Sequence, residues 1–373
     1  GRLSFLIASE AHTWLLMARL SGMLNGTMDI SGTSDRPIVN GYLDFDSTAV
    51  RLALTGTEYR FSEDSIPVRD NVVDFSRFAI SGCNENPLTV DGTVDFKDLN
   101  NMKFNLALKA ANMQIVNSRK ASKGADVYGK AYIDLNGHVT GSMRLMNVDA
   151  KLGILAGTNV SYVIPDATSA IVNRSNSDMV KFVSFADSNA VAVADSLTYT
   201  GMAMFLDAEL SVESGSIISV DLSSDGKNKV QLLSNGSLDY TMTPLSDGRL
   251  VGRLNIDGGF VRYSQPPIIS EKIFNFQNGS YVAFNGDMMN PTLNIHAVDV
   301  LKANVTQTGQ NSRLVNFDVA LGVTGTLSQM NVAFDLSTND DMTVANELES
   351  MTREQRANQA MNLLLYNVYT KSE

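Results

Sequence analysis

Apolar and polar residues alternate with a period of two along most of this chain, and this pattern restricts the fold more than any other feature. Two such runs joined by a short polar turn at residues 98–101 predict an antiparallel hairpin with one apolar and one wet face. The apolar positions of the two runs are Leu88, Val90, Val94 and Phe96, followed by Met102, Phe104, Leu106, Leu108 and Ala110.

The same alternation returns many times along the sequence. Gly, Asn, Asp and Ser gather between the runs, as tight turns require. We therefore predict an all-β protein, a meander of many antiparallel strands. The further alternating runs are residues 131–135, 218–222, 238–242, 250–256, 293–297, 315–323 and 330–336.

Helical periodicity is convincing only near the C-terminal end. Thr352 and Gln355 have the spacing of a capping box, which predicts that a helix starts there. A shorter helix is expected around residues 346–350, and we favour a short helix over a strand at residues 5–16. The apolar stripe expected on the terminal helix is Ala357, Ala360, Met361, Leu364, Leu365 and Val368.

These patterns divide the chain into four regions. We expect a first β region at residues 1–165, a loop-rich segment at 166–200, a second β region at 201–340 and a helical segment at 341–373. An internal repeat supports the pair of β regions. The segments GYLDFD and GRLNID begin at Gly41 and Gly252, and each continues with Val-Arg after three further residues.

Composition excludes several classes of protein. The formal net charge of -11 argues against a nucleic-acid partner, because phosphates need a basic surface. Cys83 is the only cysteine, so an intrachain disulfide and a thiolate metal cluster are both excluded. No apolar run reaches the roughly 20 residues of a transmembrane helix. The chain begins at Gly1 without a signal peptide, and we interpret it as a fragment of a longer protein.

Catalytic constellations are absent from the sequence. His12, His138 and His296 lie in separate segments without ligand-spaced partners, and Cys83 lies in a turn without a basic neighbour. Residues 124–130 have the spacing of a phosphate-binding loop, but Ala131 follows where a Ser or Thr should hold Mg²⁺. We expect no enzyme, no cofactor and no metal site.

The apolar face of the strands has two possible fates. In a sandwich, two such faces close on each other as a dry core. In a single curled sheet, the face lines a groove. Periodicity alone leaves both alternatives open.

Several ordered segments resemble the C-terminal domain of the TamB family, within the AsmA-like superfamily of bridge-like lipid-transfer proteins. Residues 236–263 form a Gly-rich strand pair that ends in an aromatic residue, and residues 272–280 read KIFNFQNGS. Residues 290–297 then read NPTLNIHA, and residues 323–335 resemble the closing repeat of the family. Each motif is weak alone, and the ordered set carries the resemblance, which covers nearly the whole chain.

The resemblance implies a fold and a function. It implies an elongated antiparallel sheet curled into a U-shaped (taco-like) groove with an apolar interior, and a short C-terminal amphipathic helix. It implies a periplasmic protein that is anchored in the bacterial inner membrane by an N-terminal helix. Such proteins are linked to phospholipid transport between the two membranes and to the assembly or secretion of outer-membrane proteins. The anchor and the tail that docks on an outer-membrane barrel assembly protein are both missing from this sequence.

Phospholipid acyl chains are the expected ligand, and strand alternation assigns the residues that face them. Lys103, Asn105, Lys109 and Asp134 are expected on the opposite, outer face. Two alternatives to lipid transport remain: a chaperone-like module that pairs with strands of outer-membrane proteins, and a structural spacer with a closed core. The expected groove-lining residues are Leu88, Val90, Val94, Phe96, Met102, Phe104, Leu106, Leu108, Ile133, Leu135, Leu238, Tyr240, Leu254, Ile256, Leu293, Ile295, Phe317, Val319, Val332 and Phe334.

Overall fold

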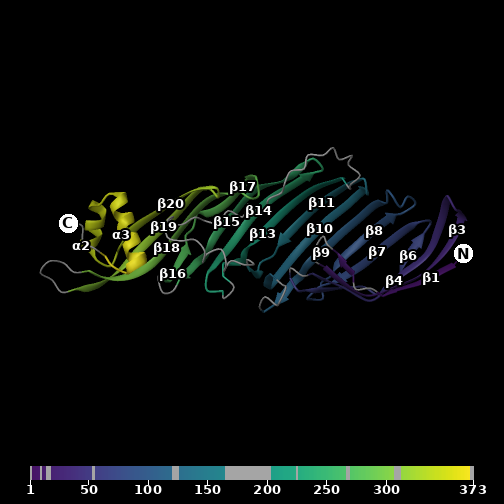
Figure 1. Cartoon of the computed structure of the whole chain (residues 1–373), viewed down its shortest axis with the longest axis horizontal. Coiled ribbons are helices and arrows are strands. Elements are labelled where there is room, and N and C mark those ends of the chain that lie inside the picture. Colours follow the sequence, from purple (N-terminus) through teal and green to yellow (C-terminus); the bar gives the residue numbers. More distant parts are fainter. Residues whose placement is uncertain are drawn as a thin grey trace. The chain divides into compact units, whose positions relative to one another are not determined.

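The predicted all-β class is confirmed by the computed structural model (Figure 1). Strands account for most of the described residues, and the helices found among these are α2 and α3, close to the C-terminal end. The structure describes residues 2–8, 11–13, 18–52, 55–119, 126–163, 203–223, 226–265, 269–305 and 312–369.

The chain divides into two compact units. The first comprises Gly1–Tyr162, Ala186–Ser216 and Gly236–Gly252, and the second comprises Val163–Phe185, Ile217–Asn235 and Arg253–Glu373. Three long strands contribute residues to both units, namely β13 (Ala203–Asp221), β14 (Lys229–Thr243) and β15 (Ser246–Gln265).

The first unit is built from strands that mostly pair with their neighbours in the chain. Its strands are β1 (Arg2–Ala8), β2 (Ala11–Thr13), β3 (Ala18–Thr33), β4 (Arg36–Leu52), β5 (Glu58–Phe61), β6 (Ile66–Arg69), β7 (Val72–Ser81), β8 (Leu88–Asp95), β9 (Lys103–Ser118), β10 (Val127–Ser142), β11 (Leu145–Ile154) and β12 (Asn159–Val163). From β3 to β11 the ladder is antiparallel, and β11 then pairs in parallel with β13. Short connections permit this meander, because antiparallel neighbours need only a tight turn.

The hairpin predicted around residues 98–101 is confirmed. β8 pairs with β9 in the register that places Val94 opposite Phe104 and Val90 opposite Leu108. The backbone N–H of Asn101 donates to the carbonyl of Asp98 at 3.0 Å, which closes the turn.

Several bulges interrupt the strict alternation in the first unit, and two of them contain a residue whose amide is held by a carboxylate. At Arg77 in β7 the backbone has a φ of 60°, and its N–H donates to Oδ1 of Asp91 on β8 at 2.7 Å. At Asn112 in β9 φ is 48°, and its N–H donates to Oδ1 of Asp134 on β10 at 2.7 Å. In both cases a carboxylate on the next strand satisfies the amide that the bulge removes from the ladder. Bulges bend a strand and increase its twist, so these positions curve the sheet.

The internal repeat has a structural counterpart in two glycines. Gly41 in β4 and Gly252 in β15 both have positive φ, 157° and 136°. A Cβ at Gly41 would lie 1.9 Å from the carbonyl oxygen of Thr27, and one at Gly252 would lie 2.3 Å from that of Ser237. Only glycine fits where a neighbouring strand approaches this closely.

The second unit adds further strands and the two helices. These elements are β16 (Ile269–Phe276), β17 (Ser280–Gly286), β18 (Thr292–Val305), β19 (Arg313–Thr326), β20 (Gln329–Ser337), α2 (Met342–Ser350) and α3 (Arg353–Tyr366). β18, β19 and β20 form an antiparallel ladder, and β18 also pairs with β16 and β17. Figure 1 shows α2 and α3 beside this ladder.

The caps of both helices follow from local sequence. Asp341 accepts hydrogen bonds from the backbone N–H groups of Thr343 and Val344, and so caps α2. The predicted capping box of Thr352 and Gln355 is confirmed at the start of α3. Asn367 ends α3 in the left-handed conformation, which asparagine tolerates better than most residues.

Three expectations need correction or lie outside the description. The short helix expected at residues 5–16 is wrong where the structure describes it, because β1 and β2 are strands that pair with β3. The apolar stripe expected on α3 is partly wrong, because the helix buries a different set of side chains. Ala360 and Leu363 are buried, whereas Leu365 and Val368 are exposed. The loop-rich segment at 166–200 lies outside the described residues.

Candidate functional site

The first unit presents a continuous apolar face on neighbouring strands. Ile66 of β6, Phe78 of β7 and Val90 of β8 form the centre of one cluster, against which Leu106 and Leu108 of β9 pack. Four phenylalanine rings gather at this cluster. The centroid of Phe78 lies 5.5, 5.6 and 5.8 Å from those of Phe45, Phe61 and Phe75. Such separations are favourable for edge and tilted aromatic contacts.

A second cluster continues the apolar face toward β10. Tyr59, Ala110 and Met113 are buried at its centre, and Ile133 and Leu135 pack against them. The hydroxyl of Tyr59 donates to the carbonyl of Ile115 at 2.7 Å, and burial raises the pKa of this tyrosine. The polar end of the ring is therefore satisfied at the backbone, and its body adds to the apolar face.

No helix covers this face within the part of the first unit that the structure describes. Every pair of its elements with extensive contacts is a pair of strands that are neighbours in the sheet. Most apolar side chains here consequently remain half-buried, including Phe45, Leu106 and Leu135. A face of this kind offers apolar contact surface to a ligand without first having to open a core.

The residues predicted to line a groove in this unit fall into three groups. Leu88, Ile133 and Leu135 belong to the cluster around Met113, and Val90, Leu106 and Leu108 belong to the one around Phe78. Leu238 is buried, and the remaining members are half-buried: Val94, Phe96, Met102, Phe104 and Tyr240. Nothing bound to the molecule tests their role, which stays a prediction.

The aromatic residues of this face were missed by the sequence analysis. Phe45, Phe61, Phe75 and Phe78 come from three strands that the alternation did not single out. Phe75 and Phe78 are three residues apart and would fall on opposite faces of a regular strand. The bulge at Arg77 brings both rings to the same cluster.

In the second unit, one apolar cluster is formed by strand residues alone. Ile256, Phe276 and Ala297 are buried at the centre of a cluster, with Ile295 half-buried beside them. The predicted residues Leu254 and Leu293 are half-buried, and Val332 on β20 is 40% exposed.

Another part of the apolar face of this unit lies beneath the two helices. Phe317 and Val319 of β19 are fully buried, and Leu336 of β20 is 2% exposed. They share one cluster with Val344 and Leu348 of α2, Ala360 and Leu363 of α3, and Tyr369, with Phe334 partly buried at its edge. Phe317 and Val319 were predicted to line a groove, but the structure places them in a closed core.

Polar contacts surround this helical cap, defined as α2 and α3 with the residues up to Tyr369. Nε of Arg356 lies 2.6 Å from Oδ1 of Asp335, and Arg313 forms an ion pair with Asp341. Burial raises the pKa of Tyr369, and the Glu347 carboxylate raises it further.

A charged pair is buried at the edge of the cap. Lys272 and Asp299 are 7% and 9% exposed, on strands whose neighbouring side chains are apolar. Burial lowers the pKa of Lys272, which the charge of Asp299 partly offsets, and burial raises the pKa of Asp299. Nζ of Lys272 also donates to Oδ1 of Asn367 at 3.0 Å, which ties the end of α3 to β16.

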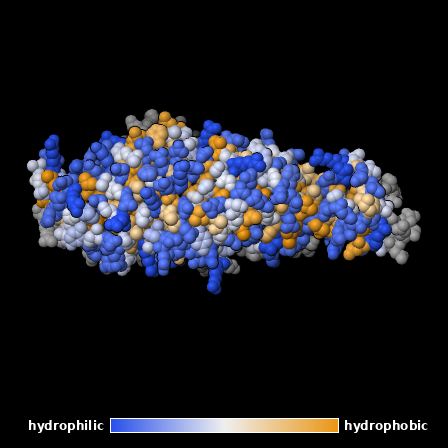
Figure 2. All heavy atoms as spheres, turned by 180° about the vertical axis from the view of Figure 1, so that it is seen from behind, coloured by the Kyte–Doolittle hydropathy of each residue, from blue (hydrophilic) through white to orange (hydrophobic). Residues whose placement is uncertain are grey.

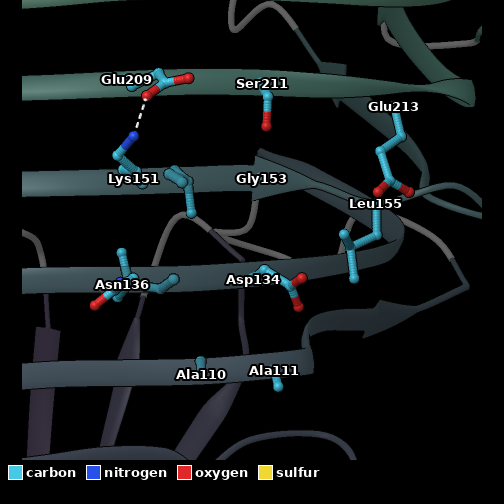
Figure 3. A pocket seen from close by; sticks show the side chains of 12 residues that line it. Ala110, Ala111, Asp134, Asn136, Lys151, Gly153, Leu155, Glu209, Ser211 and Glu213 are labelled. Carbon is cyan, nitrogen blue, oxygen red and sulfur yellow. Dashed lines mark ion pairs between the residues drawn. The ribbon is translucent and has the colours of Figure 1, made fainter.

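The first unit also carries a hollow of about 380 Å³, lined by both charged and apolar residues and shown in Figure 3. Nζ of Lys151 lies 2.8 Å from Oε2 of Glu209, and the N–H of Ala156 donates to Oε2 of Glu213 at 2.9 Å. Asp134, expected on the outer face, lies here and holds the bulge at Asn112. Each of these carboxylates is engaged by another residue of the first unit, through an ion pair or a backbone hydrogen bond. Figure 2 shows one side of the molecule, on which hydrophilic residues predominate and hydrophobic ones are scattered among them.

Groups that could carry chemistry are dispersed. In the part of the chain that the structure describes, no three His, Cys, Asp or Glu side chains are grouped to hold a metal ion. Burial raises the pKa of the Cys83 thiol, which disfavours the reactive thiolate. His296 is exposed on its strand. Val127–Ser142 is a strand, so the phosphate-loop-like segment opens no helix, although residues 124 and 125 lie outside the description.

Comparison with known proteins decides the family. The family model of the TamB C-terminal domain matches residues 76–372. The chain belongs to the TamB family. No curated protein and no solved structure matches it.

Membership of the TamB family carries coarse functional information. TamB proteins belong to the bacterial envelope and form a non-enzymatic transport and assembly module. The matched residues include both the uncovered apolar face from β8 onward and the helical cap. Among the described residues, no helix has the length and apolar composition needed to span a membrane.

Proposed function

We propose that this TamB chain is a periplasmic segment that binds phospholipid acyl chains and passes them between the inner and outer membranes. One observation carries the proposal: the apolar side chains of the first unit's face are mostly half-buried, and no helix covers them among the described residues. In water such a face is unfavourable unless a partner covers it. We further propose that the full-length protein is anchored in the inner membrane.

The energetics suit a hydrocarbon ligand. Each CH₂ group moved out of water contributes about 0.8 kcal/mol, so a long acyl chain gains on the order of 10 kcal/mol before entropic losses. Because neighbouring strands present similar aliphatic and aromatic side chains, the gain changes little from one strand to the next. An acyl chain can therefore move along the strands without passing a position of much higher affinity. No catalytic residue is required.

A role in the assembly of outer-membrane proteins rests on a different feature. In the described part of the chain β20 pairs along one edge only, with β19. An exposed edge accepts an extended strand through backbone hydrogen bonds. We propose the first part of this edge, residues 329–332, as the candidate site for unfolded outer-membrane strands, because α3 lies against the later part through the contact of Arg356 with Asp335. We propose an outer-membrane barrel assembly protein as the partner of the full-length chain.

Site-specific photo-crosslinking in cells tests the lipid proposal. A photoreactive residue at Leu106 should capture phospholipid, because this side chain lies on the apolar face. The matched control is Asn105, the exposed neighbour on the opposite face of β9, which should capture none. Equal capture from both positions, or capture from neither, would remove the support for a lipid path.

A further inference from the structure

The apolar face of the second unit can be divided into rows that cross β18, β19 and β20. Strand register places Ile295, Val323 and Val332 side by side as the first row, with Ala297, Leu321 and Phe334 as the second. Asp299, Val319 and Leu336 form the third row, and Leu301 and Phe317 the fourth.

Along β19 and β20, exposure falls from the first row to the third and fourth, whereas on β18 Ala297 in the second row is already 1% exposed and Leu301 in the fourth is half-buried. Val332 in the first row is 40% exposed, and Ile295 and Val323 are half-buried. In the third and fourth rows, Val319 and Phe317 have no exposed surface. On both strands the change takes four residues, from Val323 to Val319 on β19 and from Val332 to Leu336 on β20.

The chain's own helical cap produces this fall in exposure along β19 and β20. Leu363 of α3 and Leu348 of α2 pack into the same cluster as Phe317. The ring of Tyr369 stacks on that of Phe317, with centroids 5.0 Å apart and an interplanar angle of 24°. Apolar side chains of the cap therefore occupy the surface that a ligand would cover elsewhere.

Polar contacts fix the cap at three separate points. The ion pair of Arg313 with Asp341 holds the start of α2. Arg356 holds the first half of α3 to Asp335 on β20. Lys272 holds the C-terminal end of α3 through Asn367. These contacts stabilise the cap on the strands at its beginning, middle and end.

We infer that the helical cap is the end wall of the lipid-binding face, and that lipid enters or leaves the second unit over the row Ile295, Val323 and Val332. This inference rests on the proposed function. A ligand displaces the cap only if it gains more beneath the cap than on the open rows. Ile295, Val323 and Val332 in the first row offer aliphatic contacts without that cost, so acyl chains should stop at the second row.

A phospholipid with a diazirine in its acyl chain tests the inference on the unaltered protein. After irradiation, mass spectrometry of peptides should locate adducts on Val323 and Val332. It should find at least tenfold fewer on Val319, Phe317 and Leu363. Adducts on β9 in the same sample report separately on the proposed function.

The outcomes separate the two claims. Adducts on β9 together with equal labelling of Phe317 and Leu363 would overturn the end wall and leave lipid binding intact. Adducts on β9 without any on Val323 or Val332 would also overturn it, because the open rows would then be inaccessible. Absence of adducts from β9 and from the open rows would overturn the proposed function, and the inference with it.

A variant that loosens the cap provides the positive control. Leu363→Ala removes a fully buried side chain of α3 and leaves the strands unchanged. Labelling of Phe317 should rise several-fold in this variant if the cap alone excludes lipid. Labelling of Phe317 that stays at the wild-type level, with Val332 labelled as before, would contradict the cap as the cause of the exclusion.

Discussion

Arg356 on α3 donates a hydrogen bond from Nε to Oδ1 of Asp335 on β20, and the two atoms lie 2.6 Å apart. The contact joins the helical cap to the last strand of the ladder. Burial alone would raise the pKa of Asp335, but the hydrogen bond and charge of Arg356, with the backbone N–H of Leu336, outweigh it and lower this pKa.

The lowered pKa predicts how the cap responds to acid. A carboxyl group with a folded pKa below its unfolded value, about 4, stabilises the folded state above that value. The contribution disappears as the pH falls through the lower, folded pKa. Asp335→Asn should therefore reduce the melting temperature at pH 7, and its effect should shrink as the pH falls below the unfolded value. Asp318→Asn, on the neighbouring strand β19, is the control. An equal, pH-independent effect of both substitutions would contradict the assignment.

Two leucines of α3 test which side of the helix faces the sheet. Leu363 is fully buried, so Leu363→Ala should lower the free energy of unfolding by about 2–5 kcal/mol. Leu365 is 38% exposed, and Leu365→Ala should cost about 1 kcal/mol or less. Urea denaturation measures both values. A larger cost at Leu365 would mean that α3 packs on the stripe expected from its sequence.

The bulge at Arg77 predicts a stabilising role for an exposed carboxylate. Asp91→Ala removes the acceptor of the Arg77 N–H, and the free energy of unfolding should fall by about 1–3 kcal/mol. The Arg77 amide should then exchange with solvent faster. Asp149→Ala, at an exposed strand position without a hydrogen bond among the described residues, should change little. Equal effects of the two substitutions would show that Asp91 does not hold the bulge.

The sequence analysis succeeded where a local rule decides the structure. The hairpin of β8 and β9 follows from alternation and a polar turn, and the start of α3 follows from Thr352 and Gln355. Both features depend on residues only a few positions apart, so the sequence contains all the information they need.

Features that depend on distant partners were missed. Residues 5–8 became a strand because β3 offers an edge to β1, and no local propensity records that edge. Phe317 and Phe104 both lie in runs of regular apolar and polar alternation, yet only Phe317 is covered by the helices α2 and α3. The positive φ of Arg77 depends on Asp91 across the ladder, which alternation within one strand does not reveal.

The substitution Leu106→Asp tests the central claim most directly. Native mass spectrometry of the purified chain should show bound phospholipid on the wild type and on Asn105→Asp, the matched control on the polar face. Leu106→Asp should remain folded by circular dichroism, because an uncovered face leaves the carboxylate hydrated, and should lose the lipid. If the face were instead closed as a core, the unpaired charge would cost several kcal/mol and unfold the domain. An unfolded Leu106→Asp, together with a wild type that carries no lipid, would contradict the account.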